Sequence, residues 1–141
     1  MKKTTTLFML LATVFLINSC SSDGNGEASI YHKWYYKERI VGESTYPYIY
    51  GSCGKDYVEF YDTNKVRQVA IIDCQPVMGS TGTFTKQENA ISMTTTYSSG
   101  ETSIVTGTIT ALTEHSLTIQ YDDITVAPSG QIFNTIIKYE R

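Results

Sequence analysis

The chain has 141 residues, of which 41% are hydrophobic and 18% are charged. This length and composition fit one packed domain and exclude collagen-like, coiled-coil and fully disordered chains. The net charge of −3, from 11 Lys and Arg against 14 Asp and Glu, lacks the basic surface that nucleic-acid phosphates require. Eleven Tyr, five Phe and one Trp favour strands, because aromatic and branched side chains fit a pleated, half-buried surface. The composition therefore predicts an all-β domain that does not bind nucleic acid.

Residues 1–19 have the pattern of a signal peptide for export. Lys2 and Lys3 precede an apolar run over residues 7–17, and polar and small residues follow it. The run is too short for a permanent transmembrane helix, which needs about 20 apolar residues. We therefore expect residues 1–19 to be removed and the remainder to be exported to the cell envelope.

The segment Leu16-Ile17-Asn18-Ser19-Cys20 resembles the lipobox of bacterial lipoproteins. That resemblance implies cleavage before Cys20, diacylglycerol on its sulfur and acylation of its new amino group, which together anchor a protein stably in a membrane. Ser21 after the cysteine is compatible with the outer membrane. Residues 20–29 then form the lipidated Cys and a flexible tether, since this segment has almost no apolar side chains to bury. The alternative is an ordinary cleaved signal peptide that leaves Cys20 as a free thiol.

Two further cysteines, Cys53 and Cys74, remain in the exported domain. An even pair in an oxidising compartment indicates a disulfide, which would stabilise the domain by about 3 kcal/mol. The alternatives are two buried thiols or two metal ligands. The metal is disfavoured because a site needs three or four ligands, and His32 and His115 lie far from both cysteines without metal-binding spacing.

From Trp34 onward the chain alternates between strand-type runs and short polar breaks. Val58 and Phe60 illustrate the pattern, because they share one face of a run in which Glu59 points away. The short polar connections make consecutive strands antiparallel neighbours. Eight strands are predicted, over residues 33–41, 57–61, 66–73, 81–86, 90–97, 103–112, 116–121 and 131–141.

Two longer loops are predicted between these strands. Residues 42–54 gather Tyr46, Tyr48 and Tyr50 around a proline, which suits either an aromatic lid over a cavity or a loop packed on itself and held by Cys53. Residues 122–130 contain two adjacent aspartates, which lack the spacing of a calcium loop and are interpreted as a solvated turn.

Eight antiparallel strands can protect their edges by closing into a barrel, with an open β-sandwich as the alternative. Residues 30–141 resemble the small bacterial lipocalin-like lipoproteins. The resemblance rests on the Trp34-bearing first strand, the Cys53 and Cys74 pair and the ending Lys138-Tyr139-Glu140-Arg141, although His32 stands where lipocalins normally carry Gly. It implies an eight-stranded up-and-down barrel whose base is plugged by Trp34, stacked on Lys138 or Arg141.

The sequence contains none of the short catalytic, phosphate-binding or metal-binding motifs, so neither an enzyme nor a cofactor is predicted. Fold analogy favours a binding module for a small apolar or amphipathic ligand. The alternative is a protein-interaction or inhibitor lipoprotein with a filled barrel, acting through its surface loops. The candidate ligand-binding residues are Tyr46, Tyr48, Tyr50, Phe60, Ile91, Met93 and Ile119.

Overall fold

The computed structural model describes residues 28–126 and 131–141. All regular structure in these residues is β, which confirms the predicted class. The strands are β1 (Lys33–Val41), β2 (Ser44–Pro47), β3 (Tyr57–Tyr61), β4 (Lys65–Ile72), β5 (Gln75–Gln87), β6 (Ala90–Tyr97), β7 (Thr102–Leu112), β8 (Ser116–Val126) and β9 (Gln131–Glu140). The predicted signal peptide, Cys20 and most of the predicted tether lie outside the described residues.

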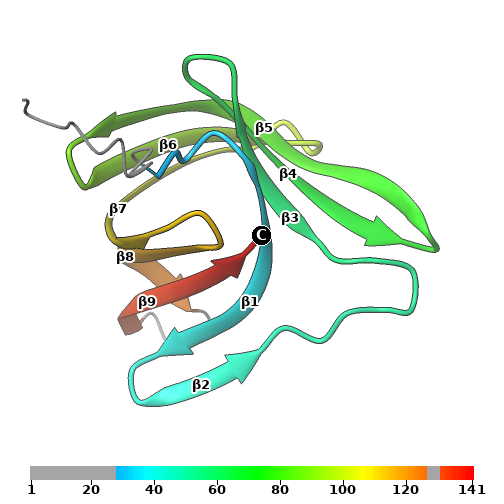
Figure 1. The fold of residues 1–141 in the computed structure, drawn as a ribbon, viewed down its shortest axis with the longest axis horizontal. Coiled ribbons are helices and arrows are strands. Elements are labelled where there is room, and N and C mark those ends of the chain that lie inside the picture. The colour runs from blue at the N-terminus through cyan, green and yellow to red at the C-terminus, as the bar shows by residue number, and fades with distance from the viewer. Residues whose placement is uncertain (1–27, 127–130) are drawn as a thin grey trace, which may run out of the picture.

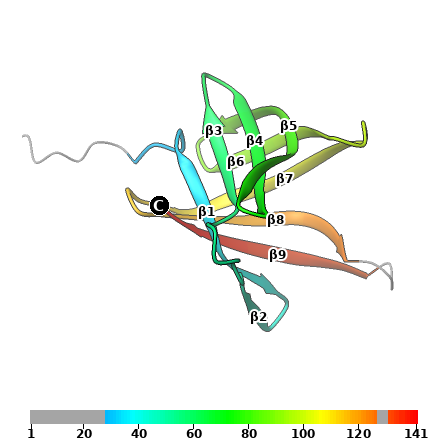
Figure 2. The ribbon, with the colours of Figure 1, turned by 90° about the vertical axis from the view of Figure 1, so that its right-hand side faces the viewer.

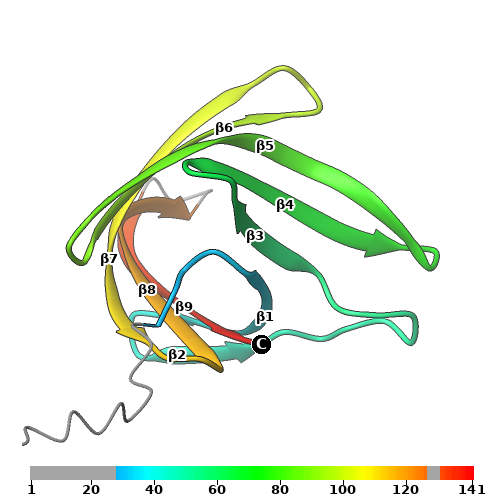
Figure 3. The ribbon, with the colours of Figure 1, turned by 45° about the horizontal axis from the view of Figure 1, so that its top comes forward.

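The strands form one closed antiparallel barrel. Each of β3 to β9 pairs with its neighbour in sequence, and β1 closes the ring by pairing with β3 on one edge and β9 on the other. The walls formed by β3–β5 and by β7–β9 face each other in Figure 3, and Figure 2 shows β8 and β9 side by side along one wall. The predicted eight-stranded barrel is confirmed, and the β-sandwich is excluded.

Strand β1 divides one of its edges between two partners. Residues 33–35 pair with β3, whereas residues 38–41 pair with β2, and the ladder to β9 shifts register between Tyr36 and Glu38. Because β2 occupies the second half of this edge, β3 pairs only with the first half. Beyond that point β3, β4 and β5 diverge from β1. In Figure 1 the β4–β5 hairpin extends away from the rest, and the chain after β2 runs towards its tip.

Three predicted boundaries are wrong. The expected loop over residues 42–54 contains β2, which forms a tight turn with β1. Residues 75–80, which no predicted strand covers, belong to β5. This strand begins at Gln75 after a two-residue turn in which Asp73 and Cys74 have φ of 49° and 63°, as a type I′ hairpin requires. The expected turn at 122–130 starts later, because β8 continues through Asp122 to Val126.

One end of the barrel, which we call the base, is filled. The segment before β1 lies in the base. There the indole Nε1 of Trp34 donates a hydrogen bond to the carbonyl oxygen of Ile30 at 2.8 Å. Trp34, Leu117 and Ile119 are fully buried. The remaining core side chains are Ile30, Val58, Phe60, Val66, Phe84, Ile91, Met93, Ile109, Tyr121 and Tyr139.

Two glycines allow neighbouring backbones to approach closely. A Cβ on Gly82 would lie 1.9 Å from the carbonyl oxygen of Thr94, and one on Gly107 would lie 2.4 Å from that of Gln120. A side chain at either position would therefore displace a neighbouring strand. Both glycines permit the tight curvature of a small barrel.

Candidate functional site

The end of the barrel opposite the base, which we call the mouth, contains a cavity of about 580 Å³. Its position follows from the closure of the barrel, because the inward side chains of β1 and β6 to β9 meet above the filled base. This volume lies within the range of small-molecule sites. The cavity is lined by Tyr36, Gln68, Met93, Tyr97, Glu101, Ser103, Ile104, Val105, Tyr121, Ile137 and Tyr139.

Three tyrosines form the buried end of this cavity. The hydroxyls of Tyr121 and Tyr139 lie 3.0 Å apart and share a hydrogen bond, and both side chains are less than 5% exposed. The ring of Tyr36 lies against that of Tyr139, with 5.1 Å between centroids. The buried end therefore combines flat apolar surfaces with phenolic hydroxyl groups.

Burial raises the pKa of all three phenols. Desolvation raises the pKa of Tyr121 to about 12, although its hydrogen bond to Tyr139 acts in the opposite direction. Desolvation likewise raises the pKa of Tyr36 and Tyr139 far above the usual value for tyrosine. At neutral pH all three side chains are uncharged groups that can donate or accept a hydrogen bond.

Two further hydroxyls lie at the level of the cavity without a hydrogen-bond partner among the described residues. Ser80 Oγ and Thr135 Oγ1 are each on a residue that is 1% exposed. Ser80 is paired across the sheet with Gln68 and Tyr97, and Thr135 with Tyr121, so both share the inward face with cavity-lining residues. A buried hydroxyl without a partner carries a desolvation cost, and neither residue is among those that line the cavity.

The predicted tyrosines of the loop lie beside the cavity rather than in its lining. Tyr48 stacks on Tyr36 with 4.8 Å between ring centroids, and Tyr50 stacks on Tyr48 at 6.3 Å. Tyr46, on β2, is 50% exposed and lies beneath the guanidinium of Arg39 at 5.6 Å. Tyr46 and Tyr48 line a separate hollow of about 340 Å³, together with Arg39, Pro47 and Ile49.

The predicted interior residues divide between the two halves of the barrel. Met93 lines the cavity. Phe60, Ile91 and Ile119 lie in the packed core and are absent from the cavity lining. Phe60, for example, packs edge to face on Phe84, with 4.9 Å between ring centroids. These three predicted ligand contacts are therefore core residues.

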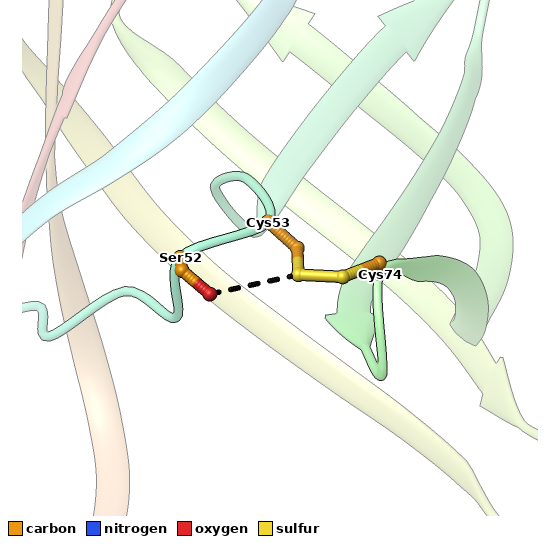
Figure 4. The surroundings of a disulfide bond; sticks show 3 residues. All are labelled: Ser52, Cys53 and Cys74. Carbon is orange, nitrogen blue, oxygen red and sulfur yellow. Dashed lines mark hydrogen bonds between the residues drawn. A yellow bond between two sulfur atoms is a disulfide. The ribbon is translucent and has the colours of Figure 1, made fainter.

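The disulfide between Cys53 and Cys74 is confirmed (Figure 4). It joins the loop after β2 to the turn between β4 and β5, at a Cα–Cα distance of 4.8 Å. The end of the same loop is held by Asp56, whose carboxylate accepts from the backbone NH of Ile71 at 2.7 Å. These two contacts attach the loop that bears Tyr48 and Tyr50 to the β4–β5 hairpin. The attachment spans the region where β1 and β3 diverge.

Of the residues predicted to plug the base, Trp34 is buried there, whereas Lys138 lies on the outer face. Strand alternation turns Tyr139 inward and Lys138 outward, where Lys138 Nζ pairs with Glu38 at 2.7 Å. The indole of Trp34 meets the ring of His32 edge-on, with 6.0 Å between centroids. Arg141 reaches His32 from the chain end, with Nη1 3.3 Å from Nε2. In the described structure His32 therefore lies between Trp34 and Arg141.

No group of three or more potential metal ligands occurs among the described residues. The same part of the chain contains no helix long and apolar enough to cross a membrane. No protein-family model and no curated protein matches the chain. The interpretation of the cavity therefore rests on its own geometry.

Sequence reasoning missed most of the cavity. Tyr36, Tyr121 and Tyr139 alternate with polar neighbours just as the core residues do, so periodicity alone does not separate them from the filled base. One signal was available: tyrosine at an inward position carries a hydroxyl that needs a partner. Two such tyrosines on adjacent strands indicate a polar site inside the barrel.

Proposed function

We propose that this protein is a lipid-anchored binding protein of the cell envelope that holds a small molecule in the mouth of its barrel. The observation that carries the proposal is the cavity of about 580 Å³. A barrel that worked only as a rigid platform for protein contacts would gain stability by filling this space with side chains. The retained space therefore favours a ligand over the inhibitor alternative.

The position of Ala28, the first described residue, suits an anchor. Ala28 lies at the base, against the turn between β5 and β6 and the end of β7, whereas the cavity opens at the other end. A chain attached to a membrane through Cys20 would therefore be held by its closed end. The mouth would remain accessible from the aqueous side.

The test of binding is native mass spectrometry of protein extracted from the producing cell. We expect a bound small molecule in the natural protein and its loss in Val105→Trp, because Val105 lines the cavity and the larger ring would occupy it. Val77→Trp is the matched control, since Val77 is 42% exposed and outside the cavity lining. Absence of any bound molecule, or retention of it in Val105→Trp, would contradict the proposal.

The test of anchoring is the mass of the N-terminal peptide from the membrane fraction. We expect a peptide that begins at Cys20 and carries acyl chains, and release of the Cys20→Ala protein from the membrane. A mature chain with an unmodified Cys20 would show that the anchor is absent.

A further inference from the structure

The lining of the cavity carries one charge at neutral pH, and that charge is negative. Among the described residues that line the cavity, Glu101 is the one ionised group, and no Lys or Arg is present. No ion pair of Glu101 is found in the described parts of the chain. An anionic ligand would therefore meet a like charge without a cationic partner, whereas a cation would meet an opposite charge.

Glu101 lies opposite Tyr97 at the turn between β6 and β7. The backbone NH of Tyr97 donates to the carbonyl oxygen of Glu101 at 2.8 Å, next to the strand pair of Thr96 and Thr102. Directly opposite residues of an antiparallel pair project from the same face, and both side chains line the cavity. Because the β5–β6 turn is at the base, this turn at the other end of β6 is at the mouth. The mouth thus presents a carboxylate beside an aromatic ring, and each of these groups attracts an ammonium ion.

This part of the lining is both polar and accessible. Glu101 is exposed and Tyr97 is 40% exposed, so a cation held between them keeps part of its hydration and avoids most of the cost of a buried charge. Gln68 and Tyr97 are both paired with Ser80 across the sheet, and Ser103 follows Glu101 on β7. The Gln68 amide oxygen and the Ser103 hydroxyl, both in the lining, are further acceptors for an ammonium group.

The lining further from this turn is mainly apolar and aromatic. Met93 and Val105 form a cross-strand pair of β6 and β7, and Ile137 of β9 lines the same cavity. The phenolic hydroxyls of Tyr121 and Tyr139 bond to each other, so each already has a partner within the wall. The inner part of the cavity therefore suits the apolar portion of a ligand.

We propose that the cavity binds an amphiphilic organic cation. Its ammonium group would contact the Glu101 carboxylate and the Tyr97 ring at the mouth. Its apolar part would lie inward, against Met93, Val105 and Ile137. This inference rests on the proposed binding function and assigns its ligand class. The net charge of −3 acts in the same direction, because a negative protein attracts cations to its surface.

Three probes with equal numbers of carbon atoms test the charge preference: octan-1-amine, which is protonated at neutral pH, octan-1-ol and octanoate. They are titrated at neutral pH by isothermal calorimetry into the Cys20→Ala protein, purified without detergent. We expect octan-1-amine to bind at least about fivefold more tightly than either other probe, a difference of roughly 1 kcal/mol. Added salt should weaken the binding of octan-1-amine and leave that of octan-1-ol unchanged.

Equal or tighter binding of octan-1-ol or octanoate would overturn the inference while leaving a binding function intact. Failure of all three probes would overturn the inference as well. The binding function is decided separately, by the native mass spectrometry of protein from the producing cell.

The contribution of the carboxylate is tested with Glu101→Gln, which removes the charge and keeps the size of the side chain. We expect the affinity for octan-1-amine to fall about fivefold, to that of octan-1-ol, and the affinity for octan-1-ol to stay the same. Glu88→Gln is the matched control, because Glu88 is also exposed but lies in the β5–β6 turn at the base. Unchanged binding of octan-1-amine to Glu101→Gln would overturn the proposal.

The contribution of the aromatic ring is tested with Tyr97→Leu and Tyr97→Phe. Tyr97→Leu removes the ring and should weaken the binding of octan-1-amine about threefold, as expected for one exposed cation–π contact. Tyr97→Phe keeps the ring and should bind nearly as well as the natural protein. Equal binding of octan-1-amine by the Leu and Phe variants would overturn the contact with Tyr97.

Discussion

Tyr121 and Tyr139 lie on adjacent strands and share a hydrogen bond of 3.0 Å inside the barrel. Removal of one hydroxyl leaves the other buried without that partner, so Tyr121→Phe or Tyr139→Phe should each lower the free energy of unfolding by about 1–2 kcal/mol. The double variant should lose less than the sum of the two, because it leaves neither hydroxyl of the pair behind. Urea denaturation of the four proteins measures this coupling, and strictly additive losses would contradict it.

Alkaline pH should destabilise the protein through the same tyrosines. In the unfolded chain tyrosine ionises near pH 10, whereas in the folded chain the pKa of Tyr121 is about 12 and that of Tyr139 is raised as well. The stabilisation is fully present below about pH 10. It is lost as the pH rises towards the folded pKa, because only the unfolded chain releases these protons.

For Tyr121 this loss amounts to about 2 kcal/mol by pH 12. Chemical denaturation as a function of pH, followed by circular dichroism, measures it, and tyrosinate absorbance of the folded protein reports the late ionisation. Tyr121→Phe should show a shallower decline of stability above about pH 10. A decline identical to that of the natural protein would contradict the assignment.

Substitution of Gly82 should strain the barrel wall. The Cβ of Gly82→Ala would lie 1.9 Å from Thr94 O and 2.8 Å from Thr95 Cα, both backbone atoms, so β5 and β6 must move apart. We expect a loss of about 3 kcal/mol, at the upper end of overpacking effects. Gly51→Ala is the control, since nothing lies within 4 Å of its Cβ, and its thermal unfolding should be almost unchanged. Equal stability of the two variants would contradict this account of Gly82.

Loss of the disulfide should weaken the domain without abolishing the barrel. Cys53 and Cys74 are exposed, at the end of a loop and in a hairpin turn, whereas the core lies elsewhere. Cys53→Ser/Cys74→Ser should therefore lose about 3 kcal/mol by the loop-closure model and keep its β-sheet circular dichroism spectrum.

Hydrogen exchange should locate the effect of that loss. We expect faster exchange between residues 49 and 54 and unchanged protection around Trp34. Ser52→Ala is the matched control in the same loop. Exchange that increases equally throughout the barrel would show that the disulfide supports the core rather than the loop.

The strand order could be predicted because its signals are local. Val58 and Phe60 on one face of a short run, followed by a polar connection of a few residues, leave an antiparallel neighbour as the simplest arrangement. The missed strand β2 and the early start of β5 had weaker signals. Their turns depend on Gly42, Asp73 and Cys74 with positive φ. Gly and Asp are common at such positions, whereas Cys is not, so the turn at residues 73–74 carried only part of the usual signal.

The cavity could not be predicted in the same way. Tyr139 and Lys138 are adjacent, yet one lines the cavity and the other pairs with Glu38 outside. The prediction placed Lys138 at the base because the resemblance concerned a short terminal motif. The direction of the Lys138 side chain depends instead on the pairing of β9 with β1, where the register shifts between Tyr36 and Glu38.

The amino-acid sequence alone therefore determined an all-β chain, its antiparallel order and its cysteine pair, because alternation and loop length act between near neighbours. Only the tertiary structure decided which inward side chains fill the base and which line the cavity. That division depends on strand stagger, on the bulges and on the displacement of β3 by β2 along β1. These are relations between segments far apart in the chain, and they turn an otherwise regular pattern of inward residues into a barrel with one filled end and one hollow end.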